Sequence, residues 1–281
     1  SGSWVVFDDG VSTTRSVVVT GLSEGSSYSF RVSAVNSVGR SSGQVLGVVS
    51  AKPISASMAT CVITGSGRVG CLGGNTYGML GDGTRTSRFE FHEVPGLENV
   101  EQVSTGWSHT CAVTSNGKVW CWGYNNVGQL GNGTTINASR PVQVSGLTGA
   151  TQVAAAETQA CAVKSDGRVW CWGGARLGNG SAAGSTVPVQ VSDLTTAIQI
   201  SGKYEHFCAL KSDQNVVCWG WNALNIMGDS TGTDRLVPTA PNPALPMGAL
   251  QVSAGVFGVS VLLTNGTVRS WGSGNNGALG N

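Results

Sequence analysis

The sequence predicts an all-β protein built mainly from a repeated unit of about 50 residues. Glycines and short Val-rich runs alternate along the chain, and 42 of its 281 residues are glycine. The cysteines occur in pairs ten residues apart, at Cys61, Cys71, Cys111, Cys121, Cys161, Cys171, Cys208 and Cys218. This period is typical of β-propeller blades or of a β-solenoid. Apolar residues at helical spacing do not recur in the sequence, which excludes helical repeats.

Within the second repeat the pattern predicts four short strands, at residues 101–104, 110–114, 118–122 and 141–144. Residues 115–117 join the middle two strands, and Gly117 suits the left-handed position of a bulged hairpin turn. The fourth repeat has Gln214 at the same place. First strands of the other repeats are expected near Ile54, Gln152, Gln199 and Gln251. Four repeats match the whole pattern and a fifth stops before its last strand, so we predict four to five blades.

The cysteine spacing predicts one disulfide in each hairpin. Folding the second repeat about Asn116 places Cys111 opposite Cys121, and opposed residues on antiparallel strands lie within disulfide range. In the fifth repeat both positions are serine, Ser260 and Ser270. Free buried thiols are an alternative, and zinc is disfavoured because its cysteine ligands usually lie two to four residues apart. Four disulfides indicate an oxidising compartment, which predicts an extracellular or cell-surface location.

The segment 111–131 reads C-A-V-T-S-N-G-K-V-W-C-W-G-Y-N-N-V-G-Q-L-G. It resembles a repeat of the regulator-of-chromosome-condensation superfamily in its Cys-paired, bacterial-type form. The resemblance covers about residues 54–281 and departs from the pattern at Leu72, around Ala175 and at Asn225. It implies a β-propeller. Members usually close with seven blades, so the resemblance also implies a partial propeller whose remaining blades belong to the parent chain.

Residues 1–53 differ in kind, because they carry no cysteine and do not share the repeat phase. The run Y-S-F-R-V-S-A from Tyr28 alternates apolar and polar residues, which predicts a half-buried strand. It resembles the penultimate strand of a fibronectin type III module, with Tyr28 as the tyrosine corner. Other strands are expected at residues 4–9, 16–20 and 43–49. We therefore predict two parts: a partial fibronectin type III-like sandwich at 1–53 and propeller repeats at 54–281.

The charge balance and the short motifs exclude several classes of function. The 16 basic and 15 acidic residues leave a net charge of +1, without a Lys/Arg cluster, which argues against nucleic acid as a partner. No apolar run approaches the ~18 residues that cross a bilayer. The match to a nucleophile motif at residues 39–43 falls in a turn between two predicted sandwich strands. The matches to a dinucleotide motif are turn glycines of the repeat, and His109 and His206 are interpreted as turn supports. We expect a protein that is not an enzyme, with no catalytic residue, cofactor or metal.

Aromatic residues separate into repeating and non-repeating sets. The repeating set is expected to pack between blades: Trp122, Trp172, Trp219 and Trp271. Trp107 and Tyr204 do not repeat and lie in the turn between first and second strands, whereas Tyr124 and Trp221 follow the third strand. In an up-and-down blade both places open onto one face. Since aromatic side chains are effective anchors for recognition, we predict a binding surface there, with rim packing as the alternative.

We therefore expect a non-catalytic extracellular binding or adhesion scaffold that contacts a protein or glycan through loops on one propeller face. The resemblance leaves other functions open. Secreted relatives inhibit β-lactamases through such a face, and nuclear relatives exchange guanine nucleotide on a small GTPase. A structural spacer within a large surface protein is a further alternative.

Overall fold

The computed structural model describes residues 54–241 and 244–273, and the backbone of four short strands before them. These strands are β1 (Tyr28–Phe30), β2 (Val35–Asn36), β3 (Gly39–Arg40) and β4 (Leu46–Val48). Strand β1 pairs with β4 and β2 pairs with β3, both antiparallel. These pairings do not establish the predicted fibronectin-type module, and its expected strands at 4–9 and 16–20 lie outside the described residues. Within the described part, no helix is long and apolar enough to cross a membrane.

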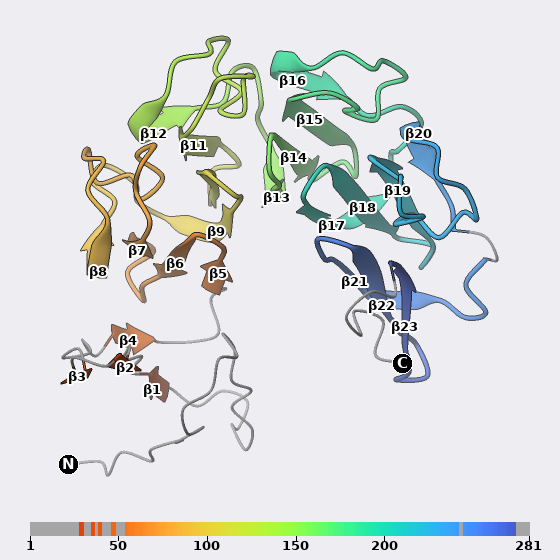
Figure 1. Ribbon diagram of the computed structural model, residues 1–281, viewed down its shortest axis with the longest axis horizontal. Coiled ribbons are helices and arrows are strands. Elements are labelled where there is room, and N and C mark those ends of the chain that lie inside the picture. Colours follow the sequence, from red (N-terminus) through yellow and green to blue (C-terminus); the bar gives the residue numbers. More distant parts are fainter. Residues whose placement is uncertain are drawn as a thin grey trace.

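From residue 54 the described chain forms five successive antiparallel sheets, which we call blades 1 to 5 (Figure 1). Blade 1 contains β5 (Ile54–Ala56), β6 (Ala59–Ile63), β7 (Val69–Gly73) and β8 (Arg88–Glu93). Blade 2 contains β9 (Val100–Thr105), β10 (His109–Thr114), β11 (Val119–Gly123) and β12 (Ala138–Gln143). Blade 3 contains β13 (Ala150–Ala155), β14 (Gln159–Lys164), β15 (Val169–Gly173) and β16 (Ser185–Gln190). Blade 4 contains β17 (Ala197–Lys203), β18 (His206–Lys211), β19 (Val216–Gly220) and β20 (Arg235–Thr239). Blade 5 contains β21 (Ala249–Ala254), β22 (Gly258–Leu263) and β23 (Val268–Gly272).

The blades follow one another along an arc, with the first strand of each innermost and the fourth outermost (Figure 1). This confirms the predicted all-β propeller architecture. The largest difference from the predicted strands is in β12, which begins at Ala138 rather than at Pro141. Its pairing with β11 shifts register between Cys121 and Gly123, so the ladder resumes at Ala138 beyond a bulge. An outermost strand tolerates Pro141 because its free edge needs no N–H donor.

A disulfide joins the second and third strands in each of blades 1 to 4. In blade 2, Cys111 and Cys121 are register partners with Cα atoms 4.1 Å apart, and both are fully buried. The same bond joins Cys61 to Cys71, Cys161 to Cys171 and Cys208 to Cys218. The predicted pairing is confirmed. In blade 5, Ser260 and Ser270 share this register, and their hydroxyl groups form a hydrogen bond of 2.8 Å.

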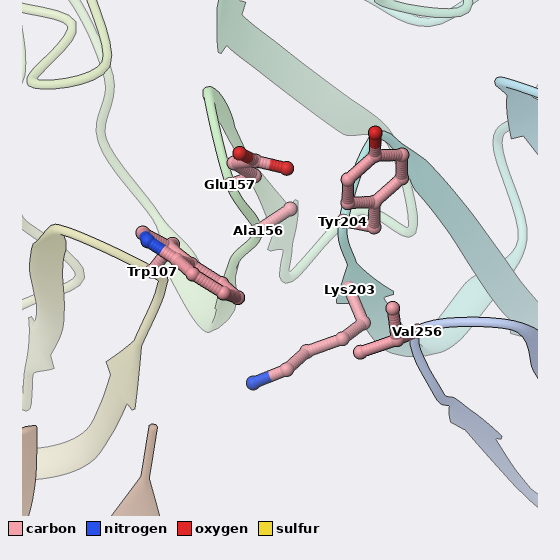
Figure 2. A pocket seen from close by; sticks show the side chains of 6 residues that line it. All are labelled: Trp107, Ala156, Glu157, Lys203, Tyr204 and Val256. Carbon is pink, nitrogen blue, oxygen red and sulfur yellow. The ribbon is translucent and has the colours of Figure 1, made fainter. Parts of the chain in front are cut away.

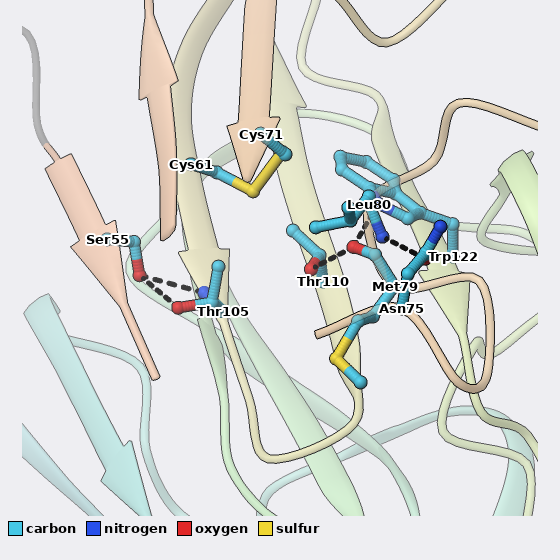
Figure 3. Close-up of a disulfide and its surroundings, with 9 residues drawn as sticks. All are labelled: Ser55, Cys61, Cys71, Asn75, Met79, Leu80, Thr105, Thr110 and Trp122. Atoms are coloured by element: carbon cyan, nitrogen blue, oxygen red, sulfur yellow. Dashed lines mark hydrogen bonds between the residues drawn. A yellow bond between two sulfur atoms is a disulfide. The ribbon is translucent and has the colours of Figure 1, made fainter. Parts of the chain in front are cut away.

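The hydrophobic cores lie between consecutive blades. Trp122 of blade 2 is fully buried in a cluster that includes Leu80 and the Cys61–Cys71 disulfide of blade 1 (Figure 3). Its Nε1 donates a hydrogen bond of 2.8 Å to the carbonyl of Met79. The next repeat copies this contact, because Trp172 Nε1 donates to the carbonyl of Gln129 at 2.9 Å. The expected packing of the repeating tryptophans between blades is therefore observed.

Each of these tryptophans packs against a glycine of the preceding blade. Gly131 has a φ of 63°, and a Cβ there would lie 2.7 Å from Cδ1 of Trp172. The other pairs are Gly81 with Trp122, Gly178 with Trp219 and Gly228 with Trp271. Glycine is thus required at this position for two reasons: the backbone is left-handed, and the indole occupies the space that a Cβ would need.

A buried asparagine holds the loop that carries this glycine. The Oδ1 atom of Asn125 accepts a hydrogen bond from the N–H of Leu130 at 2.9 Å. Its Nδ2 donates to the carbonyls of Thr134 and Ile136, each at 3.0 Å. Asn75 in blade 1 and Asn222 in blade 4 make the same bonds. In blade 3 the loop is shorter and Ala175 replaces the asparagine.

The innermost strands are also joined directly. Gln102 Oε1 accepts a hydrogen bond from the N–H of Val153 at 2.6 Å, and Ser104 Oγ accepts one from Ala155 at 3.0 Å. Between blades 4 and 5 the donors are Val252 and Ala254, and the acceptors are Gln199 and Ser201. Side chains of one blade therefore accept the backbone hydrogen bonds that a neighbouring strand would otherwise accept from the next blade. These bonds fix the relative position of successive blades at the centre of the arc.

The contact between Trp172 and Gly131 can be tested with two alanine substitutions that share the same backbone. Gly131→Ala should cost about 1–2 kcal/mol for the left-handed backbone and a further 1–3 kcal/mol for overpacking against Trp172. Gly146→Ala is the matched control, because its φ is 67° and nothing lies within 4 Å of the added Cβ. Denaturant unfolding should show the larger loss for Gly131→Ala. Equal losses would contradict the contact.

The shared register of Ser260 and Ser270 predicts that blade 5 can accept a disulfide. The double substitution Ser260→Cys/Ser270→Cys should form a fifth bond during oxidative folding and raise the unfolding free energy by up to about 3 kcal/mol. Mass spectrometry after alkylation, with and without reductant, should find ten protected cysteines in the native protein. Two alkylated thiols in the non-reduced sample would show that the two positions are not paired.

Candidate functional site

The turns between first and second strands meet at the centre of one face of the arc. A shallow hollow lies there, lined by Trp107, Ala156, Glu157, Lys203, Tyr204 and Val256, and we call these six residues the hub (Figure 2). Backbone hydrogen bonds join the turns of neighbouring blades: Trp107 N–H donates to the carbonyl of Ala156, and Glu157 N–H to that of Tyr204. The hollow has a volume of about 10 Å³, far below the ~300–1,000 Å³ of small-molecule sites. The hub hollow is therefore too small to hold a small molecule by itself, and a second hollow of about 230 Å³ lies against blade 5 and shares Val256.

The structure brings two of the predicted aromatics together. Tyr204 and Trp221 form an edge-to-face pair with ring centroids 5.2 Å apart. The N–H of Trp221 donates to the carbonyl of Glu205, 2.8 Å away, so the end of the third strand meets the turn between the first two. Trp107 lies in the hub and is 51% exposed. The expectation that both places open onto one face is met in blade 4.

Tyr124 lies apart from this pair and has a partner that the sequence reasoning missed. Its ring centroid is 4.3 Å from that of Tyr77 in blade 1, at an interplanar angle of 39°. Its N–H donates to the carbonyl of Ser108, beside Trp107 in the same turn. Tyr77 occupies a loop position that holds Val127 in the next repeat. This difference between repeats was the available signal. We call the hub together with Tyr77, Tyr124 and Trp221 the hub face.

Some charged groups on this face form ion pairs, and others do not. Arg176, in the shortened loop of blade 3, binds Glu205 Oε2 at 2.9 Å and also the carboxylate of Asp234. Glu157 lies nearby, and its pKa is raised by burial and then by the negative charge of Glu205. Burial lowers the pKa of Lys203. The hub thus contains one cation and one anion that are partly withdrawn from water.

Two histidines lie buried below the turns of the hub. His109 and His206 precede a disulfide cysteine by two residues and are almost completely inaccessible to solvent. Burial lowers the pKa of each to about 4, so both are neutral at pH 7. A side chain on Gly106 would collide with the His109 ring, which places this imidazole directly under the turn of Trp107. No ring nitrogen of either histidine has a hydrogen-bond partner among the described residues, so any support of the turns comes from packing.

Acid should therefore destabilise the protein through these histidines. Below pH ~6.5 the unfolded chain binds protons that the native state excludes until about pH 4. Stability should fall across that window by up to roughly 3 kcal/mol for each residue. His206→Gln, which copies Gln159 of blade 3, should reduce the loss in urea unfolding between pH 7 and pH 4.5. The exposed His92, as His92→Gln, is the control, and equal losses in both variants would contradict the assignment.

Family models match the repeats found in the sequence. Two models of the regulator of chromosome condensation (RCC1) repeat match the chain, one at residues 66–113 and 116–163, the other at residues 100–129 and 197–225. These matches fall within blades 1 to 4. Among curated protein sequences, none matches this chain.

Solved structures show the same fold. Human WBSCR16 superposes with a TM-score of 0.70 at 22% identity, over 79% of this chain and 61% of that one. Prp20p from Saccharomyces cerevisiae gives 0.69 at 21% identity, over 81% and 59%. The ectodomain of the receptor kinase CR4 from Physcomitrella patens gives 0.53 at 16% identity, over 88% and 61%. The chain spans about three fifths of the length of each of these structures.

The repeat matches, the order of strands within each sheet and these superpositions agree with one another. At such low identities the superpositions establish the fold and not the activity. From residue 54 the described chain forms successive β-propeller blades, four of which contain matches to the RCC1 repeat, with a disulfide across the central hairpin of blades 1 to 4.

Proposed function

We propose that this chain is a non-catalytic binding scaffold that recognises a protein through the hub face. One observation carries the proposal: Trp107 and Tyr204, which do not repeat, line the hub, and Trp221 packs against Tyr204 beside it. Residues needed by the fold recur in most blades, whereas these aromatics differ between blades. Large aromatic groups that are partly exposed are the usual anchors of protein interfaces.

We also propose that the scaffold acts outside the cell or at its surface. The four disulfides support this location, because such bonds persist in oxidising compartments. The likeness to a receptor-kinase ectodomain adds that this type of propeller occurs in an extracellular part of another protein. Adhesion is the form of binding that this location favours, and a glycan array tests the alternative that the ligand is a sugar.

Nucleotide exchange is the competing function. One of the structures similar to this chain is that of Prp20p, a protein that binds Gsp1p and histones. The assay is the release of fluorescent GDP from Gsp1p in the presence of the 281-residue chain. We expect no acceleration over the intrinsic rate. A catalytic increase in the release rate would replace the proposed function with exchange.

Two substitutions on the hub face should weaken binding to a partner captured from extracellular fluid or the cell surface of the source organism. Trp107→Ala and Trp221→Ala should each weaken the Kd by tenfold or more, measured by surface plasmon resonance, because buried aromatic anchors carry most of the energy of an interface. Phe89→Ala is the matched control, since Phe89 is 91% exposed on the outermost strand of blade 1. Unchanged binding of both tryptophan variants would refute the proposed surface.

A further inference from the structure

Lys203 departs from its counterparts in other blades. The first residue of the turn between first and second strands is Gly106 in blade 2, Ala156 in blade 3 and Gly255 in blade 5. At Gly106 an added Cβ would overlap the carbonyl oxygen of Ala156, so this position faces a crowded centre. Lys203 instead directs a long side chain and a positive charge into the hub, as Figure 2 shows.

The ammonium group of Lys203 has no counter-charge in the described part of the chain. Its Nζ lies 3.4 Å from the hydroxyl of Ser57, which comes from the turn of blade 1 on the other side of the hub. No described carboxylate lies within 4.0 Å of it. Arg176 on the same face is already paired with two carboxylates. An ammonium that has lost water without gaining an anion is poised to bind one.

The surroundings of Lys203 restrict what that anion can be. Trp107 and Val256 flank it with apolar surface, while the carboxylate of Glu157 points away from the ammonium in Figure 2. Glu157 and Glu205 repel each other, since the charge of Glu205 raises the pKa of Glu157. A run of acidic residues would meet this repulsion as well. A single carboxylate, carried beside an apolar group, fits the charges and the shape together.

We propose that Lys203 sets the specificity of the hub by binding one Asp or Glu side chain on a loop of the partner protein, with a neighbouring apolar side chain of that loop on Trp107. This inference rests on the proposed function of the hub face and adds the chemistry of the partner. The Lys203 charge then acts as the polar centre of an interface whose energy comes mainly from the aromatic groups around it.

A display library of disulfide-cyclised heptapeptides, selected on the 281-residue chain, provides the probe. Peptides whose binding is lost with Trp107→Ala are the hub binders. We expect them to carry an Asp or Glu, and Lys203→Met to weaken them by at least about tenfold. The amide form of the peptide, with Asn or Gln at the acidic position, should lose as much affinity for the wild-type chain. The amide peptide should bind Lys203→Met no more weakly than either change alone would predict, because each change removes the same ion pair.

Lys118→Met is the matched control, since Lys118 lies in the hairpin turn between β10 and β11. It should leave the hub binders unaffected. Lys203→Ala, which copies Ala156 of blade 3, should melt at the wild-type temperature and bind as weakly as Lys203→Met. Hub binders that lack an acidic residue, or that bind Lys203→Met as tightly as the wild type, would overturn the role of Lys203. The proposal that the hub face binds a protein would be unaffected. If no selected peptide depends on Trp107, the proposed function and this inference fail together.

Discussion

The packing of a tryptophan against a left-handed glycine of the preceding blade determines the geometry of this protein. The indole of Trp122 is fully buried, and the glycine beneath it, Gly81, has no room for a Cβ. The bonds that Asn75 makes within the same loop hold that glycine in position. Because the contact recurs at each junction between blades, it sets their spacing. That regular spacing brings the turns of blades 2 to 5 together at the hub.

Stability within blades and stability between blades come from different interactions. Disulfides such as Cys111–Cys121 join strands of one blade, whereas tryptophans and the Gln and Ser side chains of inner strands join neighbours. The turns at the hub are held by backbone hydrogen bonds, for example from Trp107 N–H to the carbonyl of Ala156. Their side chains are therefore free to differ between blades without loss of the fold. This separation explains how a strictly repeated scaffold can present a surface that does not repeat.

Features with the period of the repeat were predictable from the sequence, and features that depend on the curvature of the arc were not. Cysteine pairing, the turn glycines and the tryptophans between blades follow from spacing alone. Even the exceptions keep the repeated backbone, since Gln214 has a φ of 65° where other repeats have glycine. The approach of Lys203 to Ser57, 146 positions apart, depends on how far the arc bends. Likewise, the ion pair of Arg176 with Glu205 depends on the path of the shortened loop of blade 3, which departs from the repeat.

The contact between tryptophan and glycine also has a direction. Each junction takes its glycine from the earlier blade and its indole from the later one, as Gly131 and Trp172 do. The repeat therefore has a direction: its two sides differ, and they are complementary only when the blades follow one another head to tail. Exchanging the order of two of blades 2 to 4, which each carry both the tryptophan and the glycine, preserves every such contact in kind. Inverting one of them would set indole against indole and glycine against glycine. Recombination between repeats in the same reading direction can thus reassort the surface residues while the architecture stays intact.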